Sequence, residues 1–236
     1  MTEPVKRSYD STKRQAQARR TRARIRDAAA QLFVERGYAA TSIAAVAERA
    51  DVSTQTIFST FGGKANLLSE AIDVALAGDD EPIAVADRPE MRETELASTA
   101  AAAAATLATF TTRIMTRAGL LLRAAEAAAD QDPDLRQRWL DGHLGRLGDM
   151  RRVATGFAAA GFLREGLGVE DAAELLWAFG DPAVYCSFRL IRRFTDAQYE
   201  DWLRRTVTIS LFGTAVEDDD GSLVDPAHHH PLEPFA

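Results

Sequence analysis

The chain has 236 residues, and its 46% hydrophobic and 27% charged residues are typical of a globular protein with enough apolar mass for a buried core. The single cysteine, Cys186, excludes an internal disulfide framework and a Cys-x-x-Cys metal or redox site. The formal net charge is −7, yet residues 1–27 are basic and the rest is acidic, which indicates either a region that meets a polyanion or a solvated basic tail.

The N-terminal third is predicted to hold a small helical domain over residues 19–77. Residues 1–18 are polar and basic without apolar periodicity, and we expect them to form a flexible arm. Thr41 or Ser42 is placed to cap a helix, and so is Ser53. Apolar residues at helical spacing predict four helices, over residues 19–36, 42–50, 53–60 and 64–77.

The C-terminal part is predicted to be a helical bundle over residues 90–213. A stretch rich in Gly, Asp and Pro at 78–89 marks the boundary before it. Thr195 and Gln198 stand three apart, the spacing of a capping box, and start the last helix. The acidic tail, 214–236, is expected to be disordered. Helices are expected at about 90–116, 118–129, 132–160, 169–179, 181–193 and 195–212, so the predicted fold class is all-α.

The strongest functional signal is the segment SIAAVAERADVSTQTIFSTF at residues 42–61. A helix-turn-helix needs a small residue where its two helices nearly touch, apolar residues that hold the crossing, and a tight turn. Ala47 supplies the small contact, and Asp51 stands at the turn, where aspartate tolerates a left-handed backbone better than most residues. The apolar positions are Val46, Ala50, Val52 and Ile57. Their spacing also fits other three-helix packings, but the neighbouring basic arm favours a DNA-binding motif.

Residues 19–73 resemble the DNA-binding domain of the TetR family of transcriptional regulators. The matching residues are Ala28-Ala29-Ala30-Gln31-Leu32-Phe33, Gly37-Tyr38-Ala39-Ala40-Thr41-Ser42-Ile43, Val46-Ala47, Val52-Ser53, Ile57-Phe58, Phe61, Lys64 and Leu67-Leu68. The C-terminal two-thirds is only generically similar, through residues 172–177 and 199–203. The resemblance implies a three-helix helix-turn-helix DNA-binding domain followed by a helical bundle for ligand binding and dimerisation.

The resemblance also implies which residues meet DNA, with the helix at 53–60 in the major groove. Base-edge contacts are expected from Thr54, Gln55 and Ser59, and Gln55 is the side chain best suited to a bidentate contact with adenine. Phosphate contacts are expected from Thr41, Thr56, Thr60 and Lys64. Ser42, Ser53 and Phe58 complete the expected DNA-binding set.

Two positions depart from the family pattern, because Phe58 stands where the family usually has Tyr and Thr60 where it usually has His. Each departure removes or reduces a side-chain donor to DNA. The basic arm is placed to compensate by following phosphates or the minor groove. Its basic residues are Lys6, Arg7, Lys13 and Arg14.

By resemblance, the chain is expected to be a homodimeric repressor that binds a palindromic operator in double-stranded DNA and releases it when a small apolar or amphipathic effector binds. Self-association is expected through residues at about 169–212. The bundle is expected to enclose the effector, with plain core packing as the alternative role of each candidate residue. These candidates are Phe110, Met115, Leu121, Trp139, His143, Phe157 and Trp177.

Other function classes find less support in the sequence. A non-specific architectural DNA-binding protein is one alternative, and a helical small-molecule enzyme is another. The enzyme has little support because His143 is the one histidine before the tail cluster at 228–230, and Cys186 has no histidine near it in sequence. We expect no cofactor and no metal. We also expect no membrane span, since the longest uncharged run, 96–112, is short and weakly apolar. The expected location is the cytoplasm.

Overall fold

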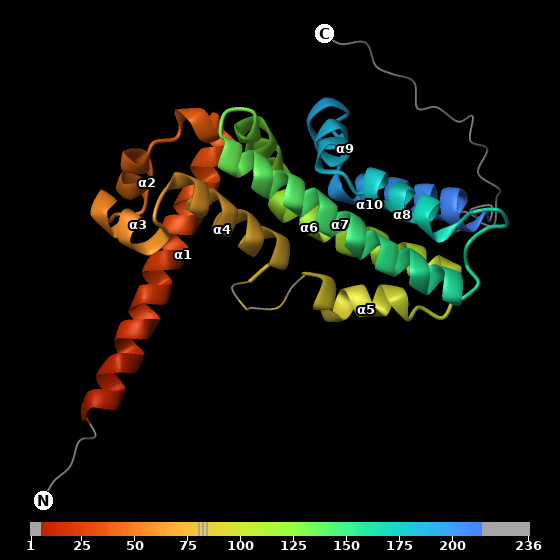
Figure 1. The fold of residues 1–236 in the computed structure, drawn as a ribbon, viewed down its shortest axis with the longest axis horizontal. Coiled ribbons are helices and arrows are strands. Elements are labelled where there is room, and N and C mark those ends of the chain that lie inside the picture. The colour runs from red at the N-terminus through yellow and green to blue at the C-terminus, as the bar shows by residue number, and fades with distance from the viewer. Residues whose placement is uncertain (1–5, 80, 82, 84, 214–236) are drawn as a thin grey trace, which may run out of the picture.

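The computed structural model describes residues 6–79, 81, 83 and 85–213, and within these ranges every regular element is a helix. Four N-terminal helices gather at one end of an elongated helical bundle, and the first half of α1 projects away from the body (Figure 1). The predicted all-α fold is confirmed. The expected tail, 214–236, and its histidine cluster lie outside the described residues. No helix in the described part of the chain combines the length and apolarity needed to cross a membrane.

The N-terminal helices differ from the prediction mainly at their start. They are α1 (Lys6–Ala40), α2 (Ile43–Arg49), α3 (Thr54–Phe61) and α4 (Lys64–Ala77). Residues 6–18, expected to be a flexible arm, are helical in α1. This stretch lacks Gly and Pro and is rich in Lys, Arg, Gln and Ala, which favour helix without any apolar periodicity. Apolar periodicity marks only the part of a helix that packs against other residues. Because α1 begins before that part, periodicity placed its start too late, at residue 19.

The turn of the helix-turn-helix has the geometry expected from its residues. Ser42 caps α2 and Ser53 caps α3, each side-chain oxygen accepting a backbone N–H three residues on at 3.1 Å. Asp51 adopts φ +50°, the left-handed conformation expected at this position. The apolar contacts between the two helices are buried, with Val46 and Ile57 fully enclosed. Local capping and the turn therefore fix the angle at which α3 leaves α2.

The bundle contains α5 (Pro89–Glu95), α6 (Ala100–Ala129), α7 (Pro133–Ala159), α8 (Val169–Phe179), α9 (Pro182–Cys186) and α10 (Asp196–Val207). A 3-10 turn at Val85–Asp87 precedes it, and π-helical turns at Ser187–Ile191 and Thr208–Phe212 follow α9 and α10. The capping box of Thr195 and Gln198 is confirmed.

One predicted helix boundary in the bundle is wrong. A single helix was expected up to residue 116 with a break at 117, but α6 runs through that point and the chain breaks at residues 96–99 instead. Thr99 caps α6 by accepting the N–H of Ala102 at 3.1 Å. The alanine run that follows Thr99 is the strongest helix-forming stretch of the chain, so a cap placed directly before it sets the helix start.

The N-terminal helices and the bundle share a core where they meet. The buried cluster of α1 to α4 includes Leu121, Ala125 and Ala128 from the end of α6 and Leu135 from the start of α7. A second cluster, centred on Phe157, Tyr199 and Leu203, lies within the bundle. The helix-turn-helix thus rests on the corner between α6 and α7, and α4 also packs along α6.

Candidate functional site

The outer face of α3 carries the residues expected to read DNA. Thr54, Gln55 and Ser59 are exposed, and Phe58 is 49% exposed, whereas Ile57 and Phe61 of the same helix point into the core. Ser42 and Ser53, the two helix caps, are exposed as well. The structure therefore presents a solvent-facing helix surface with three polar side chains and Phe58, on a helix of the width that enters a major groove. DNA contact by these residues stays a prediction.

Two residues expected to hold phosphates are instead committed to the fold. Thr41 is fully buried, and its hydroxyl donates to the carbonyls of Leu32 at 3.1 Å and Gly37 at 2.8 Å. Lys64 donates from Nζ to the carbonyls of Tyr38 at 2.9 Å and Thr41 at 3.1 Å. Its ammonium also lies over the Tyr38 ring, 4.1 Å from the centroid, and burial lowers the pKa of Lys64. Both side chains hold the corner between α1 and α2, so we expect a structural role for them, and the phosphate contacts that the resemblance implies stay predictions.

Three hydroxyls of α3, those of Thr56, Ser59 and Thr60, bond within the helix or to its cap. Ser59 and Thr60 both donate to the carbonyl of Thr56, at 3.0 and 2.6 Å, and the hydroxyls of Ser53 and Thr56 share a hydrogen bond of 2.8 Å. A phosphate contact made by donation from Ser59 or Thr60 requires the hydroxyl proton to leave this carbonyl. This change needs little movement, because the hydroxyl proton only has to rotate about the C–O bond.

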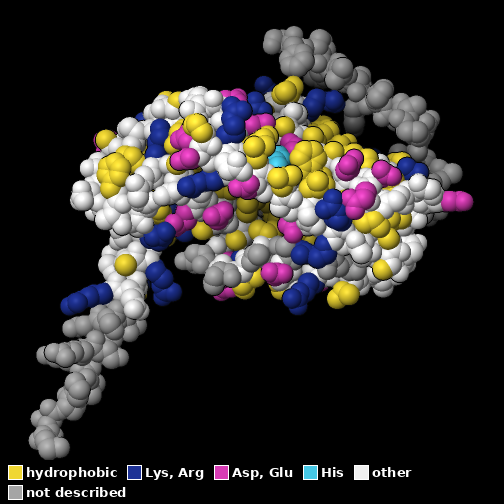
Figure 2. All heavy atoms as spheres, viewed as in Figure 1, with side chains coloured by type: hydrophobic (Ala, Val, Ile, Leu, Met, Phe, Trp, Pro, Cys, Tyr) yellow, Lys and Arg dark blue, Asp and Glu magenta, His cyan; other side chains and the backbone are white. Residues whose placement is uncertain are grey.

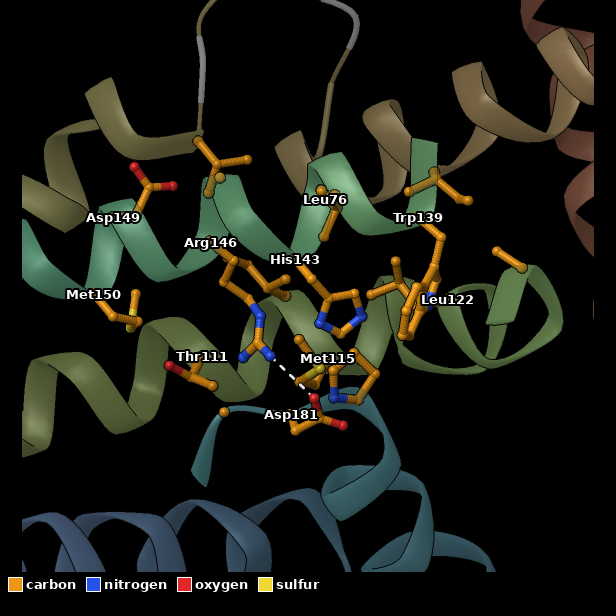
Figure 3. A pocket seen from close by; sticks show the side chains of 18 of the residues that line it. Leu76, Thr111, Met115, Leu122, Trp139, His143, Arg146, Asp149, Met150 and Asp181 are labelled. Carbon is orange, nitrogen blue, oxygen red and sulfur yellow. Dashed lines mark hydrogen bonds and ion pairs between the residues drawn. The ribbon is translucent and has the colours of Figure 1, made fainter. Parts of the chain in front are cut away.

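A cavity of about 640 Å³ lies in the bundle, within the size range of small-molecule sites. Its walls come from α4, α6, α7 and the helices from α8 to α10, and Figure 3 shows its side chains at close range. Phe110, Met115, Trp139 and His143, expected to line an effector site, lie on its wall. The other three expected residues do not. Leu121 belongs to the core under the helix-turn-helix, Phe157 to the bundle core, and Trp177 packs behind His143.

The cavity wall carries an ion pair that the sequence did not indicate. Arg146 of α7 donates to the Asp181 carboxylate at 3.0 Å and to the carbonyl of Trp177 at 2.7 Å. In Figure 3, His143 and Arg146 project from α7 toward Asp181 at the start of α9. Burial lowers the pKa of His143, and the nearby Arg146 charge adds to this effect. The helical spacing of Trp139, His143 and Arg146, which places them on one face, was the available signal.

The described ranges hold no group of three His, Cys, Asp or Glu side chains placed to bind a metal ion. Cys186 is buried, its thiol lies 3.6 Å from the carbonyl of Gly119, and burial raises its pKa. These features describe a small packed side chain rather than an activated nucleophile.

Comparison with known proteins decides the nature of the N-terminal domain. Residues 25–71 match the family model of bacterial regulatory proteins, tetR family. The chain carries a TetR-family DNA-binding domain. The match includes α2, α3 and the first half of α4, and the predicted resemblance is confirmed. The search of curated proteins finds no match to the chain.

Solved structures extend the likeness to the whole fold. A complex of SmeT with triclosan superposes with a TM-score of 0.62 at 20% identity, covering 91% of this chain and 99% of that one. SmeT, described as the repressor of the Stenotrophomonas maltophilia efflux pump SmeDEF, gives 0.58 at 20% identity, over 90% and 97%. The Bacillus subtilis regulator FadR with stearoyl-CoA gives 0.62 at 19% identity, over 79% and 96%. At these identities the likeness shows a shared fold.

A chain of hydrogen bonds connects the cavity wall to the TetR-type recognition helix α3. Arg138 of α7 lines the cavity and donates to Asn66 Oδ1 at 2.7 Å and to Ser69 Oγ at 2.8 Å. Asn66, in the first turn of α4, donates from Nδ2 to the carbonyl of Phe61 at 2.9 Å. Phe61 is the last residue of α3, so two hydrogen bonds separate a cavity-lining guanidinium from the end of α3.

A second cation also holds the end of α3 in the TetR-type domain. Arg22 of α1 donates to the carbonyl of Thr60 at 3.0 Å and pairs with the carboxylate of Glu70 on α4. Its guanidinium also lies over the Phe61 ring, 4.7 Å from the centroid. The last carbonyls of α3 therefore accept hydrogen bonds from both α1 and α4, which ties the orientation of α3 to these two helices.

Proposed function

We propose that this protein is a ligand-responsive transcriptional repressor that binds a palindromic DNA operator as a homodimer and releases it when a small molecule fills the bundle cavity. The observation that carries the proposal is the combination of a TetR-family helix-turn-helix with a cavity of about 640 Å³ whose wall hydrogen-bonds toward α3. A DNA-binding helix and a ligand-sized space in one chain are the two sites that allosteric regulation needs.

Operator recognition is assigned to the exposed face of α3. Gln55 offers an amide that can bind adenine through two hydrogen bonds, and Thr54 and Ser59 flank it on the same helix. The basic first half of α1 supplies a second, sequence-independent contact, and Figure 2 shows Lys and Arg side chains along this projecting helix.

A dimer is needed because a single short recognition helix reads too few base pairs for useful specificity. We assign this self-association to the last helices. Three large apolar side chains next to these helices are exposed: Leu190 at 54% and Ile191 at 62% after α9, and Ile209 at 56% after α10. They fall inside the region at about 169–212 that the sequence assigned to the dimer. A second copy that covers them would remove this apolar surface from water.

DNA recognition is tested by selecting bound sequences from random duplexes and then titrating the selected duplex against a shuffled one at a fixed salt concentration. We expect about a thousandfold or greater preference for the selected duplex. Gln55→Ala should weaken binding to it by about tenfold or more, whereas Gln31→Ala, on an exposed face of α1, should not. Equal affinity for both duplexes would favour the architectural DNA-binding alternative.

Ligand response is tested with decyl-chain amphiphiles of different charge, each below its micelle concentration. At least one should bind the protein and lower its affinity for the selected duplex. Ile72→Trp, which places an indole on the cavity wall, should abolish this binding, and Ile83→Trp, which lies outside the cavity, should not. Binding that leaves DNA affinity unchanged for every amphiphile would contradict the proposed release mechanism.

A further inference from the structure

The wall of the bundle cavity carries more carboxylates than guanidinium groups. Arg138 and Arg146 line it together with five carboxylates, those of Asp73, Glu126, Asp141, Asp149 and Asp181. Three of the five have partners in the protein. Asp181 binds Arg146 at 3.0 Å, Asp141 accepts a hydrogen bond from Gln137 at 2.9 Å, and Asp149 pairs with Arg152 at 3.7 Å. The other two, Asp73 and Glu126, form no hydrogen bond or ion pair with any residue that the structure describes.

The two guanidinium groups of the wall are already used. Arg146 binds Asp181 and the carbonyl of Trp177, and Arg138 donates to the neutral acceptors Asn66 and Ser69. Outside the side chains that the structure describes, the sequence has Lys and Arg only at positions 6 and 7. These positions begin α1, whose first half projects away from the bundle (Figure 1). The two unpaired carboxylates of the cavity therefore have no cation of the described chain bound to them.

Asp73 is the unpaired carboxylate with the closest relation to the DNA-binding domain. It lies on α4, one turn beyond Ser69. Burial raises the pKa of Asp73, the nearby Glu70 carboxylate adds to this effect, and the Arg138 charge opposes it. A carboxylate that loses hydration without gaining a partner is stabilised by any cation brought beside it. Its side chain is accessible, so a ligand can reach it.

Glu126 has a different electrostatic setting. Its charge and that of Arg146 both act on the pKa of His143, so Glu126 lies in a part of the cavity where the protein already supplies a cation. The rest of the wall is largely apolar, and Figure 3 shows Leu76, Met115 and Leu122 around the space. The cavity thus combines an apolar volume with a carboxylate, Asp73, that lacks an ion-pair partner among the described residues.

We propose that the effector is an apolar organic cation, whose charged group lies beside Asp73 and whose hydrocarbon part fills the bundle cavity. This inference rests on the proposed function, since it assumes that the cavity is the effector site. A hydrocarbon part gains from burial against the apolar wall, and the charge gains from the carboxylate. An anion would meet the unpaired carboxylates at a cost.

The charge of the ligand also supplies a route to α3. A cation beside Asp73 repels Arg138, because the Arg138 charge acts on the same carboxylate. Arg138 holds Asn66, which in turn donates to the carbonyl of Phe61 at the end of α3. Weakening the first of these hydrogen bonds frees Asn66 and loosens the end of α3. A neutral ligand in the same cavity lacks this repulsion, so it should affect DNA binding less.

The test measures the binding of decyltrimethylammonium, decanol and decanoate, which share a hydrocarbon chain of similar length, and of tetramethylammonium, which lacks it. Decyltrimethylammonium should bind at least about tenfold more tightly than decanol, and decanoate more weakly than decanol. Tetramethylammonium should bind more weakly than decyltrimethylammonium, because it buries no chain. At equal occupancy of the cavity, decyltrimethylammonium should lower the affinity for the selected duplex several-fold more than decanol does.

Substitutions that remove one carboxylate each locate the charged group. Asp73→Asn should reduce the affinity for decyltrimethylammonium by about tenfold and leave decanol binding unchanged, and Glu126→Gln should cause a smaller loss. Glu93→Gln is the matched control, since Glu93 is exposed on α5, lies outside the cavity wall and carries the same charge. Decanol binding and thermal unfolding report whether each variant is folded.

Two results would overturn the inference and leave the proposed function intact. If decanol or decanoate binds as tightly as decyltrimethylammonium, the cavity does not select positive charge. If Asp73→Asn binds decyltrimethylammonium like Glu93→Gln does, or loses less affinity than Glu126→Gln, the charged group does not lie beside Asp73. If no probe binds at all, the cavity assignment of the proposed function fails as well.

Discussion

The hydroxyl of Thr41 and the ammonium of Lys64 both end on backbone oxygens around the corner between α1 and α2. The resemblance to the TetR DNA-binding domain implied phosphate contacts for both residues. The difference arises because Gly37 turns the chain sharply, with φ +77°, and leaves carbonyls at this corner that need donors. Donors supplied by distant residues cannot be recognised from sequence spacing.

Substitution at this corner should therefore lower stability rather than phosphate binding. Thr41→Val and Lys64→Met should each lower the free energy of unfolding by about 1–2 kcal/mol, because buried carbonyls lose their donors. Urea unfolding measures this loss, and Lys13→Met, at an exposed position of α1, is the matched control. The slope of log affinity for DNA against log salt should stay unchanged for Lys64→Met. A slope whose magnitude is smaller by about 0.9 in Lys64→Met would show that Lys64 does contact a phosphate.

His143 predicts a pH dependence of stability. Its pKa in the folded protein lies below the ordinary value, chiefly because burial disfavours the charged ring. As pH falls through about 6.5, the unfolded chain binds a proton at this residue that the folded protein does not, and stability is lost. Melting temperatures between about pH 7.5 and 5.5 should fall less for His143→Gln than for the unmodified protein. Parallel pH profiles would show that His143 titrates alike in both states.

At the scale of elements, the contacts of α4 connect the cavity to α3. Arg138, Asn66 and the carbonyl of Phe61 join α7, α4 and α3 through two short hydrogen bonds. Asn66 does not line the cavity and is itself exposed, so its substitution removes no side chain from the cavity wall or from the core. A substitution at Asn66 therefore tests how ligand binding affects DNA affinity without removing a side chain that the ligand touches.

Changes at Asn66 should reduce the effect of a bound ligand on DNA affinity. Asn66→Ala breaks both hydrogen bonds, and Asn66→Asp keeps an acceptor for Arg138 but removes the donor to Phe61. Both variants should bind the amphiphile normally and show a several-fold smaller ligand-induced loss of DNA affinity, which titration of DNA with and without the amphiphile measures. Equal responses in both variants and the unmodified protein would place the coupling elsewhere.

Elements whose ends are fixed by local residues were the ones predicted well. Ser42, Ser53 and the pair of Thr195 and Gln198 cap helices through bonds three residues away, and Asp51 sets a turn by its own backbone. The break at residues 96–99 was missed because the apolar pattern continues through it. This boundary is set by the local cap Thr99, which apolar periodicity does not report.

The candidate site was predictable only in part, for the same reason. Helical spacing put Trp139 and His143 on one face of α7, and that face does line the cavity. Leu121 and Phe157 have equally apolar surroundings in sequence, but tertiary packing directs them into two different cores. A smaller pocket of about 170 Å³ joins residues from α4, the segment before α5, and α6, and no local pattern brings these three together.

At the scale of the whole molecule, the shared core under the helix-turn-helix fixes how the DNA-binding domain stands on the bundle. Leu121 and Leu135 are buried beneath α1 to α4, so the domain cannot tilt without repacking the corner of α6 and α7. A dimer formed through the last helices would therefore hold two copies of α3 at a fixed separation. Ligand control would then have to repack this corner, and the repacking would change the separation.

The spacing of DNA half-sites tests this central claim most directly. Inserting about half a helical turn, roughly five base pairs, between the half-sites of the selected palindrome rotates one half-site to the opposite face of the duplex. The account predicts that affinity falls by about a hundredfold or more, toward the level of non-specific binding. Affinity that does not depend on the spacing would contradict recognition by two rigidly paired α3 helices.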